Sequence, residues 1–116
     1  SPNTLLAGIF HENLHIGNIC INDIESVHKR AEITYLIGNK TYWGSGLATK
    51  SVKRVIQYLK DEYDLNKLYA GLSSLNIGSK RVLEKNRFTL EGVRKKHLYY
   101  NDTWSNCLEY GLVLSN

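Results

Sequence analysis

The chain has 116 residues, 42% of them hydrophobic, and its 15 basic and 11 acidic side chains give a net charge of +4. This length predicts one domain, residues 1–116, with one core. No run of about 18 apolar residues is present, which excludes a membrane-spanning helix, and no signal peptide is readable. We therefore expect a cytoplasmic protein without a membrane partner.

The basic side chains are interspersed with acidic ones, and the densest basic run is residues 94–97. A nucleic-acid-binding domain that uses this run remains an alternative function. A mildly basic surface also suits a polyanionic cofactor, and the interspersed charges make nucleic acid the less favoured partner.

The cysteine and histidine spacings indicate neither a disulfide nor a metal. Cys20 and Cys107 are far apart, and without a secretory signal they predict reduced core side chains. His11 and His15 have the spacing of a helical metal pair. Their flanks predict strand and loop, and no third ligand is near, so no metal is expected.

The first third of the chain predicts three strands. Residues 4–10 are short and apolar, residues 15–21 alternate, and residues 30–37 are rich in β-formers. The polar stretch 22–29 predicts a turn. Alternation in the third strand puts four side chains on one face and three on the other: Ala31, Ile33, Tyr35 and Ile37 against Glu32, Thr34 and Leu36.

An amphipathic helix over residues 47–63 follows, because apolar side chains recur at i, i+3 and i+4. Residues 67–72 predict a fourth strand, with Leu68, Ala70 and Leu72 on one face. Asn76 is a good N-cap for a second helix over residues 77–86.

The chain is then expected to end in a β-hairpin. Residues 91–100 and 106–114 predict strands, and residues 101–103 predict the turn between them. The element order is β-β-β-loop-α-β-α-β-β. The front is expected to be antiparallel, and the β-α-β unit parallel and right-handed. This is an α/β (α+β) class with a mixed, mostly antiparallel sheet.

The most informative segment is residues 42–49, which join the third strand to the first helix. Gly44 and Gly46 leave backbone N–H groups uncovered at the positive end of a helix, which favours a pyrophosphate. A P-loop requires Gly-Lys-Ser/Thr, but Leu47 follows Gly46. A dinucleotide fingerprint requires a third small residue, but Thr49 occupies that position. Both of these interpretations are weak.

The loop and its companions resemble the GNAT acetyltransferase superfamily, in its ribosomal-protein N-acetyltransferase (RimJ/RimL-like) branch. The signature [Arg/Gln]-x-x-Gly-x-Gly/Ala covers residues 41–46, with Thr41 at the first position. Residues 30–33 resemble the "RAEIG" strand that precedes the loop, and residues 76–88 resemble "N-x-x-S-x-x-V-L-E-K-x-G-F", with Arg87 in place of the glycine. Residues 90–92 and 101–104 resemble "x-E-G" and "N-G-x-W". The resemblance runs from about Thr4 to the C-terminus.

This resemblance implies a GNAT fold with a central β-α-β unit that binds acetyl-CoA (coenzyme A) as co-substrate. The family's first strand and first two helices would precede Thr4, so an N-terminally truncated form of the fold is expected. A strand end would pair with the pantetheine arm, the loop amides would hold the pyrophosphate, and the second helix would contribute further contacts. The implied contacts are Leu36, Ile37, Gly38, Trp43, Gly44, Ser45, Gly46, Leu47, Ala48, Thr49, Asn76, Ser79 and Lys85.

The implied activity is that of an N-acetyltransferase (acyltransferase class), in which a primary amine attacks the acetyl thioester directly. A strand N–H near Ile37 would polarise the carbonyl. Glu32 is the candidate base and Ser79 the candidate proton donor to the departing thiolate. Alternatively, Glu32 is an ordinary strand carboxylate and Ser79 a small polar helix residue. A protein N-terminal α-amine, a polyamine and an amino sugar all remain as acceptors, and Tyr99 and Tyr100 lie near the expected acceptor side.

A homodimer is possible for the predicted protein. The alternative to the enzyme is a non-catalytic acyl-CoA-binding GNAT-like module. Its basis is the missing first strand and first two helices of the family, together with the departures at Thr41 and Arg87.

Overall fold

The computed structural model describes residues 3–38 and 40–115, and their elements follow the predicted order. The strands are β1 (Leu5–His11), β2 (Leu14–Glu25), β3 (Arg30–Ile37), β4 (Lys67–Ser73), β5 (Thr89–Tyr100) and β6 (Thr103–Val113). The helices are the 3-10 turn η1 (Lys40–Tyr42), α1 (Leu47–Glu62) and α2 (Ile77–Lys85).

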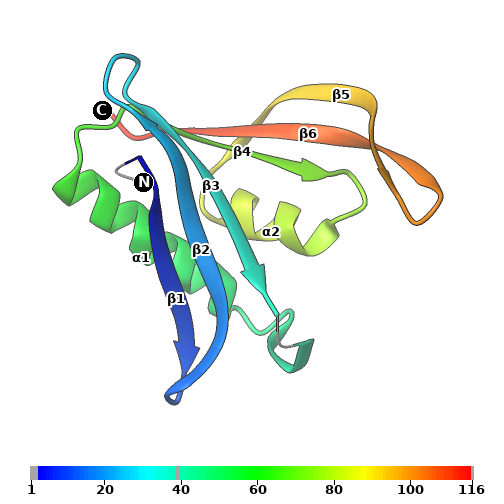
Figure 1. Ribbon diagram of the computed structural model, residues 1–116, viewed down its shortest axis with the longest axis horizontal. Coiled ribbons are helices and arrows are strands. Elements are labelled where there is room, and N and C mark those ends of the chain that lie inside the picture. The colour runs from blue at the N-terminus through cyan, green and yellow to red at the C-terminus, as the bar shows by residue number, and fades with distance from the viewer. Residues whose placement is uncertain (1–2, 39, 116) are drawn as a thin grey trace.

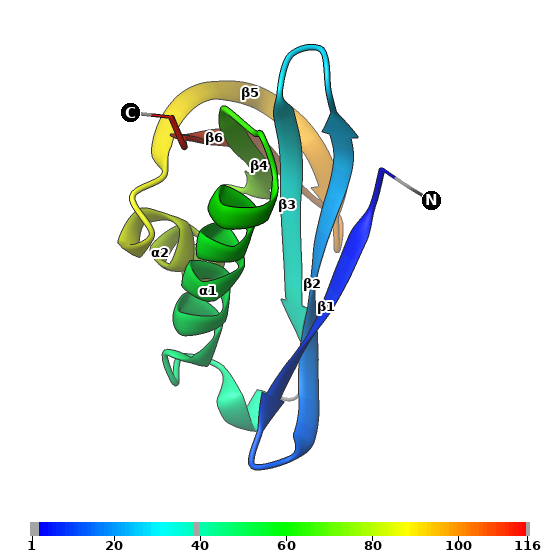
Figure 2. The ribbon, with the colours of Figure 1, turned by 90° about the vertical axis from the view of Figure 1, so that its left-hand side faces the viewer.

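The described strands form one six-stranded sheet in the order β1-β2-β3-β4-β6-β5 (Figure 1). Only β3 and β4 pair in parallel, and the other neighbours are antiparallel. Both α1 and α2 lie on the same side of β1–β3 (Figure 2). The predicted mixed, mostly antiparallel sheet with a parallel β-α-β unit is confirmed.

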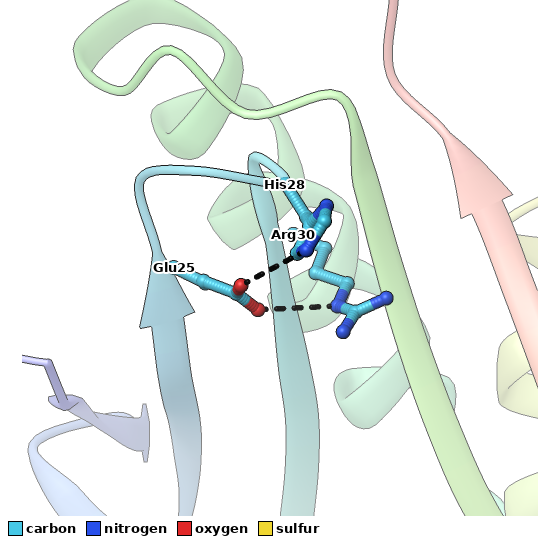
Figure 3. A network of polar contacts seen from close by, with 3 residues as sticks. All are labelled: Glu25, His28 and Arg30. Carbon is cyan, nitrogen blue, oxygen red and sulfur yellow. Dashed lines mark hydrogen bonds and ion pairs between the residues drawn. The ribbon is translucent and has the colours of Figure 1, made fainter.

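β2 runs to Glu25, so the predicted turn over residues 22–29 is wrong for residues 22–25. Pairing with β3 continues to Glu25↔Arg30 despite the polar sequence, across an irregularity where Asp23 has a φ of 52°. The Glu25 carboxylate accepts a hydrogen bond from Arg30 Nε at 3.3 Å and lies 3.7 Å from His28 Nε2 (Figure 3). Tertiary pairing therefore overrides local composition here.

The final hairpin is tighter than predicted. β5 begins at Thr89 and β6 at Thr103, which leaves Asn101 and Asp102 as the turn. Both residues have positive φ, 49° and 57°. Two such residues match the right-handed twist of the flanking strands, and asparagine and aspartate tolerate this conformation.

The core lies between the sheet and the two helices. The predicted grouping of side chains on the faces of β3 and β4 is confirmed, and α1 buries Ala48, Val52 and Leu59. The buried hydrophobic side chains of the three strands β3, β4 and β6 are Ala31, Ile33, Ile37, Leu68, Ala70, Leu72, Leu108 and Tyr110. Cys20 and Cys107 are free thiols, as predicted, but they are half-buried rather than core residues. None of the helices in the described ranges is long and apolar enough to cross a membrane.

Arg87 occupies the left-handed position that ends α2, with a φ of 68°. Its N–H donates to Glu84 O and the Phe88 N–H donates to Leu83 O, both at 3.0 Å. These two bonds are typical of helices that end in a left-handed residue, usually glycine. The resemblance gives glycine at this position too, and the backbone explains why.

Replacing Arg87 with glycine is therefore expected to raise the free energy of unfolding by about 1 kcal/mol, because the left-handed conformation penalises a Cβ atom. Urea unfolding would measure it. The matched control is Arg81→Gly within α2, where the same change is expected to lower the free energy of unfolding by about 1 kcal/mol. Equal losses from both variants would contradict this explanation.

Because of Tyr110, we expect the free energy of unfolding to fall at alkaline pH. It is 1% exposed, and its hydroxyl donates to Glu84 Oε2 at 3.3 Å. Burial, followed by the negative charge of Glu84, raises the pKa of Tyr110 above its ordinary value of 10.0. Above pH 10 the unfolded chain loses the proton that the folded chain keeps, so the free energy of unfolding falls as pH rises.

Urea unfolding between about pH 8 and about pH 11 would measure this fall. Tyr110→Phe is expected to make the fall shallower. An unchanged slope in this variant would contradict the assignment to Tyr110.

Candidate functional site

β3 and β4 separate after a short paired start. Their pairs run from Arg30↔Lys67 to Glu32↔Tyr69, and no pair in the described residues continues beyond this point. Figure 1 shows the two strands diverging toward η1 and α2. The edge of β3 after Glu32 and the edge of β4 after Tyr69 therefore face an opening with unpaired backbone groups, which can bind an extended ligand.

The backbone of β3 presents alternate residues to this opening. The Gly38 N–H donates to Ile16 O of β2 at 3.0 Å. Because successive residues of a strand direct their N–H and C=O groups to opposite edges, Leu36 also faces β2, while Tyr35 and Ile37 face the opening. The main-chain groups of Leu36 and Gly38 thus face β2, and those of Tyr35 and Ile37 are better placed to pair with a ligand in the opening.

Trp43 anchors the glycine loop to the end of β3. Its indole Nε1 donates to Ile37 O at 2.7 Å. The side chain of Trp43, a predicted ligand contact, therefore binds within the protein. This bond occupies the carbonyl of Ile37 and leaves its N–H directed into the opening.

The loop brings two left-handed glycines to the start of α1. Gly44 and Gly46 have φ of 74° and 87°, and a Cβ atom at either position would meet nothing within 4 Å. Backbone conformation, rather than crowding, thus selects glycine here. The Ser45 hydroxyl donates to Tyr42 O at 2.6 Å, which holds the turn.

The N-terminus of α1 is suited to an anion. Gly46 is its N-cap, and glycine has no side chain with which to cap the helix. The first turn carries no acidic side chain, and the N–H groups of Ala48 and Thr49 have no acceptor within the helix. The Ser45 N–H donates to Tyr42 O at 3.3 Å and the Leu47 N–H to Ser45 Oγ at 3.4 Å. Ala48 and Thr49 are therefore the better donors of the predicted series.

The N-terminus of α2 lies across the opening from β3. Asn76 Oδ1 accepts from the Ser79 N–H at 3.0 Å, which confirms Asn76 as the N-cap. The Tyr35 hydroxyl is buried and has no hydrogen-bond partner among the described residues. Burial raises the pKa of Tyr35, and the nearby Ser79 hydroxyl acts in the opposite direction. The sequence indicated only the strand face on which Tyr35 lies, because alternation reveals the face of a side chain and not its neighbours.

Asn86 joins the two helices. Its side-chain Nδ2 donates to Thr49 O in the first turn of α1 at 3.1 Å and to Val82 O at 3.0 Å. The C-terminal end of α2 is thereby held beside the glycine loop, and Lys85 lies at that end with Arg81 and Glu84 along a shallow depression. The role of Asn86 could not be predicted from the sequence, since a helix-ending asparagine carries no signal for its distant partner.

Glu32 is separated from the other candidate residues. It lies on the opposite face of β3 from Tyr35, at the last position that pairs with β4. Five residues of strand place it about 16 Å along β3 from Ile37. Its pairing partner on β4 is Tyr69, and burial, followed by the charge of Glu32, raises the pKa of Tyr69. The structure does not bring Glu32 together with Ser79.

A groove of ≈ 500 Å³ adjoins the N-terminal end of α2. Asn76 lines it from the start of α2, and Leu98, Tyr99 and Tyr100 line it from the end of β5. It is the place where the predicted acceptor-side tyrosines and the predicted Asn76 contact come together.

His11 and His15, whose spacing resembles a helical metal pair, pack against different aromatic rings. The ring of His11 lies 5.2 Å from that of Tyr42, and the ring of His15 lies 5.1 Å from that of Phe10, centroid to centroid. Within residues 3–38 and 40–115, no three His, Cys, Asp or Glu side chains gather as a metal would require.

Comparisons with known proteins agree with this arrangement. A family profile described as an acetyltransferase (GNAT) domain matches residues 3–89. A probable N-acetyltransferase, YjcK, of Bacillus subtilis is 35% identical over 72% of this chain and 45% of its own length. A ribosomal-protein-serine acetyltransferase of Escherichia coli is 28% identical over 93% of this chain and 60% of its own length.

A solved structure has the same fold and shows a ligand. The ribosomal α-N-protein acetyltransferase RimL in complex with coenzyme A superimposes with a TM-score of 0.88 at 25% identity, over 97% of this chain and 63% of that one. The chain spans about half the length of the curated relatives, between 45% and 60% of the two named above. The profile match covers most of the sequence, so this chain belongs to the acetyltransferase (GNAT) domain family.

Proposed function

We propose that the chain is the acyl-CoA-binding core of an N-acetyltransferase, which transfers an acetyl group from acetyl-CoA to a primary amine. The observation that carries this proposal is the opening between β3 and β4, which lies beside the N-terminus of α1 with its glycine N-cap. A ligand with a pyrophosphate and an extended arm needs both features. The family membership supports the same ligand.

In this proposal Ala48 and Thr49 donate to the pyrophosphate, and Lys85 adds positive charge at the end of α2. Tyr35 and Ile37 pair through their main chains with the pantetheine arm. Coenzyme A supplies the acetyl group as a thioester. The Ile37 N–H polarises the carbonyl of the acetyl thioester as negative charge develops on its oxygen. Holding the thioester and the amine together removes the entropic cost of their encounter.

The reaction forms a C–N bond and breaks the C–S bond, and the proton that leaves the amine ends on the sulfur. Ser79 donates a hydrogen bond to the departing thiolate. Glu32, on the far face of β3, is the candidate acceptor of the amine proton through intervening water. These roles are proposals for residues of this chain.

The proposed acceptor is a primary amine: a protein N-terminal α-amine, a polyamine or an amino sugar. An amine must be neutral to attack. With an ordinary pKa of about 8, roughly a tenth of an α-amine is neutral at pH 7. The absence of a strong base beside Ser79 in the described residues favours an acceptor amine that is partly neutral at pH 7, such as an α-amine. We also propose a cytoplasmic location and a homodimer, neither of which the arrangement of the site requires.

Calorimetric titration with acetyl-CoA tests the proposal. The matched ligand is S-acetyl-pantetheine, which keeps the arm and the thioester but lacks the pyrophosphate. We expect saturable binding of acetyl-CoA and much weaker binding of the shorter thioester. No binding of acetyl-CoA would contradict the proposal.

A non-catalytic acyl-CoA-binding module is the second candidate. The observation that favours it is the position of Glu32, on the opposite face from Ser79 and far along β3 from Ile37. An assay of thiol release over a panel of α-amines, polyamines and amino sugars decides between the two. Turnover supports the enzyme, and binding without turnover supports the module.

A further inference from the structure

The shallow depression on α2 has a volume of ≈ 440 Å³, and Arg81, Glu84 and Lys85 line it. Arg81 and Lys85 are four residues apart in the helix, so their side chains lie on the same face. Both residues are exposed. The depression therefore presents two neighbouring positive charges to solvent.

These positive charges are not neutralised by ion pairs within the protein. In residues 3–38 and 40–115, no lysine or arginine of α1 or α2 forms an ion pair. The lysines and arginines that do form ion pairs lie in the sheet and its turns: Lys29, Arg30, Lys67 and Arg94. Arg81 and Lys85 are thus available to an anionic ligand. Arginine suits a phosphate in particular, because its planar guanidinium can donate to two oxygens at once.

Glu84 is the acidic residue of α2, and it limits the positive charge of the depression. Its Oε2 accepts a hydrogen bond from the Tyr110 hydroxyl at 3.3 Å, and Tyr110 is buried. This bond directs one carboxylate oxygen at the core. The side chain still lines the depression, so its negative charge opposes the binding of an anion there.

Asn86 holds this end of α2 beside the glycine loop, through its bonds to Thr49 O and Val82 O. The proposed function puts the pyrophosphate of coenzyme A at the N–H groups of Ala48 and Thr49. In coenzyme A the pyrophosphate is attached to the 5′ carbon of a ribose, and the 3′ carbon of the same ribose carries a further phosphate. The 3′-phosphate is thus one sugar ring away from the pyrophosphate, on the side of the loop where α2 ends.

We propose that Arg81 and Lys85 form a subsite for the 3′-phosphate of coenzyme A, and that the chain thereby prefers acyl donors that carry this phosphate. The inference rests on the proposed function and names the form of the donor that the same site takes. No bond forms or breaks at the subsite, and the two cations contribute attraction only. The preference acts on the binding of the donor, because the ribose is at the opposite end of coenzyme A from the acetyl group.

Calorimetric titration with acetyl-CoA and with acetyl-3′-dephospho-CoA tests the subsite. The two ligands differ in one phosphate, so the ratio of their affinities measures what that phosphate contributes. We expect the wild-type chain to bind acetyl-CoA about tenfold more tightly. Arg81→Gln and Lys85→Gln are each expected to lower this ratio about threefold, and the double variant is expected to abolish the preference.

Two further variants separate the subsite from the general charge of the protein. Glu84→Gln removes a negative charge from the depression, so it is expected to raise the affinity ratio about threefold. Lys60→Gln removes a positive charge from the last turn of α1, about 16 Å along the helix axis from Thr49. At an ionic strength of about 0.1 M, exposed charges more than about 10 Å apart are largely screened. Lys60→Gln is therefore expected to leave the ratio unchanged, and a loss equal to that in Lys85→Gln would overturn the assignment.

The outcomes distinguish this inference from the function on which it rests. If the wild-type chain binds acetyl-CoA and its 3′-dephospho form equally, the subsite is overturned and the proposed function stands. If the chain binds neither ligand, both are overturned. The variants replace exposed residues, and wild-type melting temperatures are expected for all of them. Should Arg81→Gln fail to fold, Lys85→Gln and Glu84→Gln still decide, because the subsite requires that they change the ratio in opposite directions.

Discussion

Replacing Gly46 with glutamate is expected to weaken acetyl-CoA binding about 100-fold, because two unit charges about 5 Å apart repel by about 3 kcal/mol at the effective dielectric of a protein surface. The carboxylate would stand at the N-terminus of α1, where the proposal places the pyrophosphate. Gly46 also has a φ of 87°, so any side chain there strains the loop. Calorimetric titration would measure the loss.

Gly46→Gln is the matched control, since glutamine has the shape of glutamate without its charge. Both variants carry the same backbone strain, so the difference between them isolates electrostatic repulsion. We expect Gly46→Gln to retain most of the affinity that glutamate removes, and the difference to shrink at high salt. Equal affinities of the two variants would show that no anionic ligand binds at this helix terminus.

Replacing Gly17 with alanine is expected to lower the free energy of unfolding by about 3 kcal/mol. Gly17 is buried in β2, opposite Ile37 of β3. A Cβ atom at this position would overlap the carbonyl oxygen of Leu36 and stand 2.9 Å from the Cα of Ile37. Both obstacles are backbone atoms, so the two strands must move apart for the methyl group to fit.

This strain falls at the end of β3 that borders the opening, so acetyl-CoA binding should weaken together with stability. Gly71→Ala in β4 is the control, because its Cβ atom would make only an ordinary 3.5 Å contact with Cys107 Sγ. Urea unfolding of both variants would give the comparison. A Gly17→Ala chain as stable as Gly71→Ala would contradict the described packing of β2 on β3.

Periodicity and turn residues were sufficient to predict the order of the elements. β3 has the predicted bounds, and the apolar spacing of α1 marks the side chains that the core buries. The errors fall where long-range pairing decides. Residues 22–25 are polar and turn-like in isolation, but their ladder with β3 keeps them in β2. Local composition carries no information about such a partner.

The candidate site shows the same limit. The glycine loop was identifiable because left-handed backbone at a helix start requires glycine, and Gly44 and Gly46 have that conformation. The effect of the Ser79 hydroxyl on the pKa of Tyr35 joins residues that are far apart in the chain. The bond from Trp43 to Ile37 depends likewise on the path of the loop. Interactions of this kind can be identified only from the three-dimensional structure.

Residue-resolved amide hydrogen exchange with and without acetyl-CoA tests the central claim, that this ligand lies along β3 and against the start of α1. We expect slower exchange at Tyr35, Ile37, Ala48 and Thr49 when acetyl-CoA is present, and unchanged exchange at Leu36 and Gly38, which face β2. Protection confined to other parts of the chain, or no protection at saturating ligand, would contradict the claim.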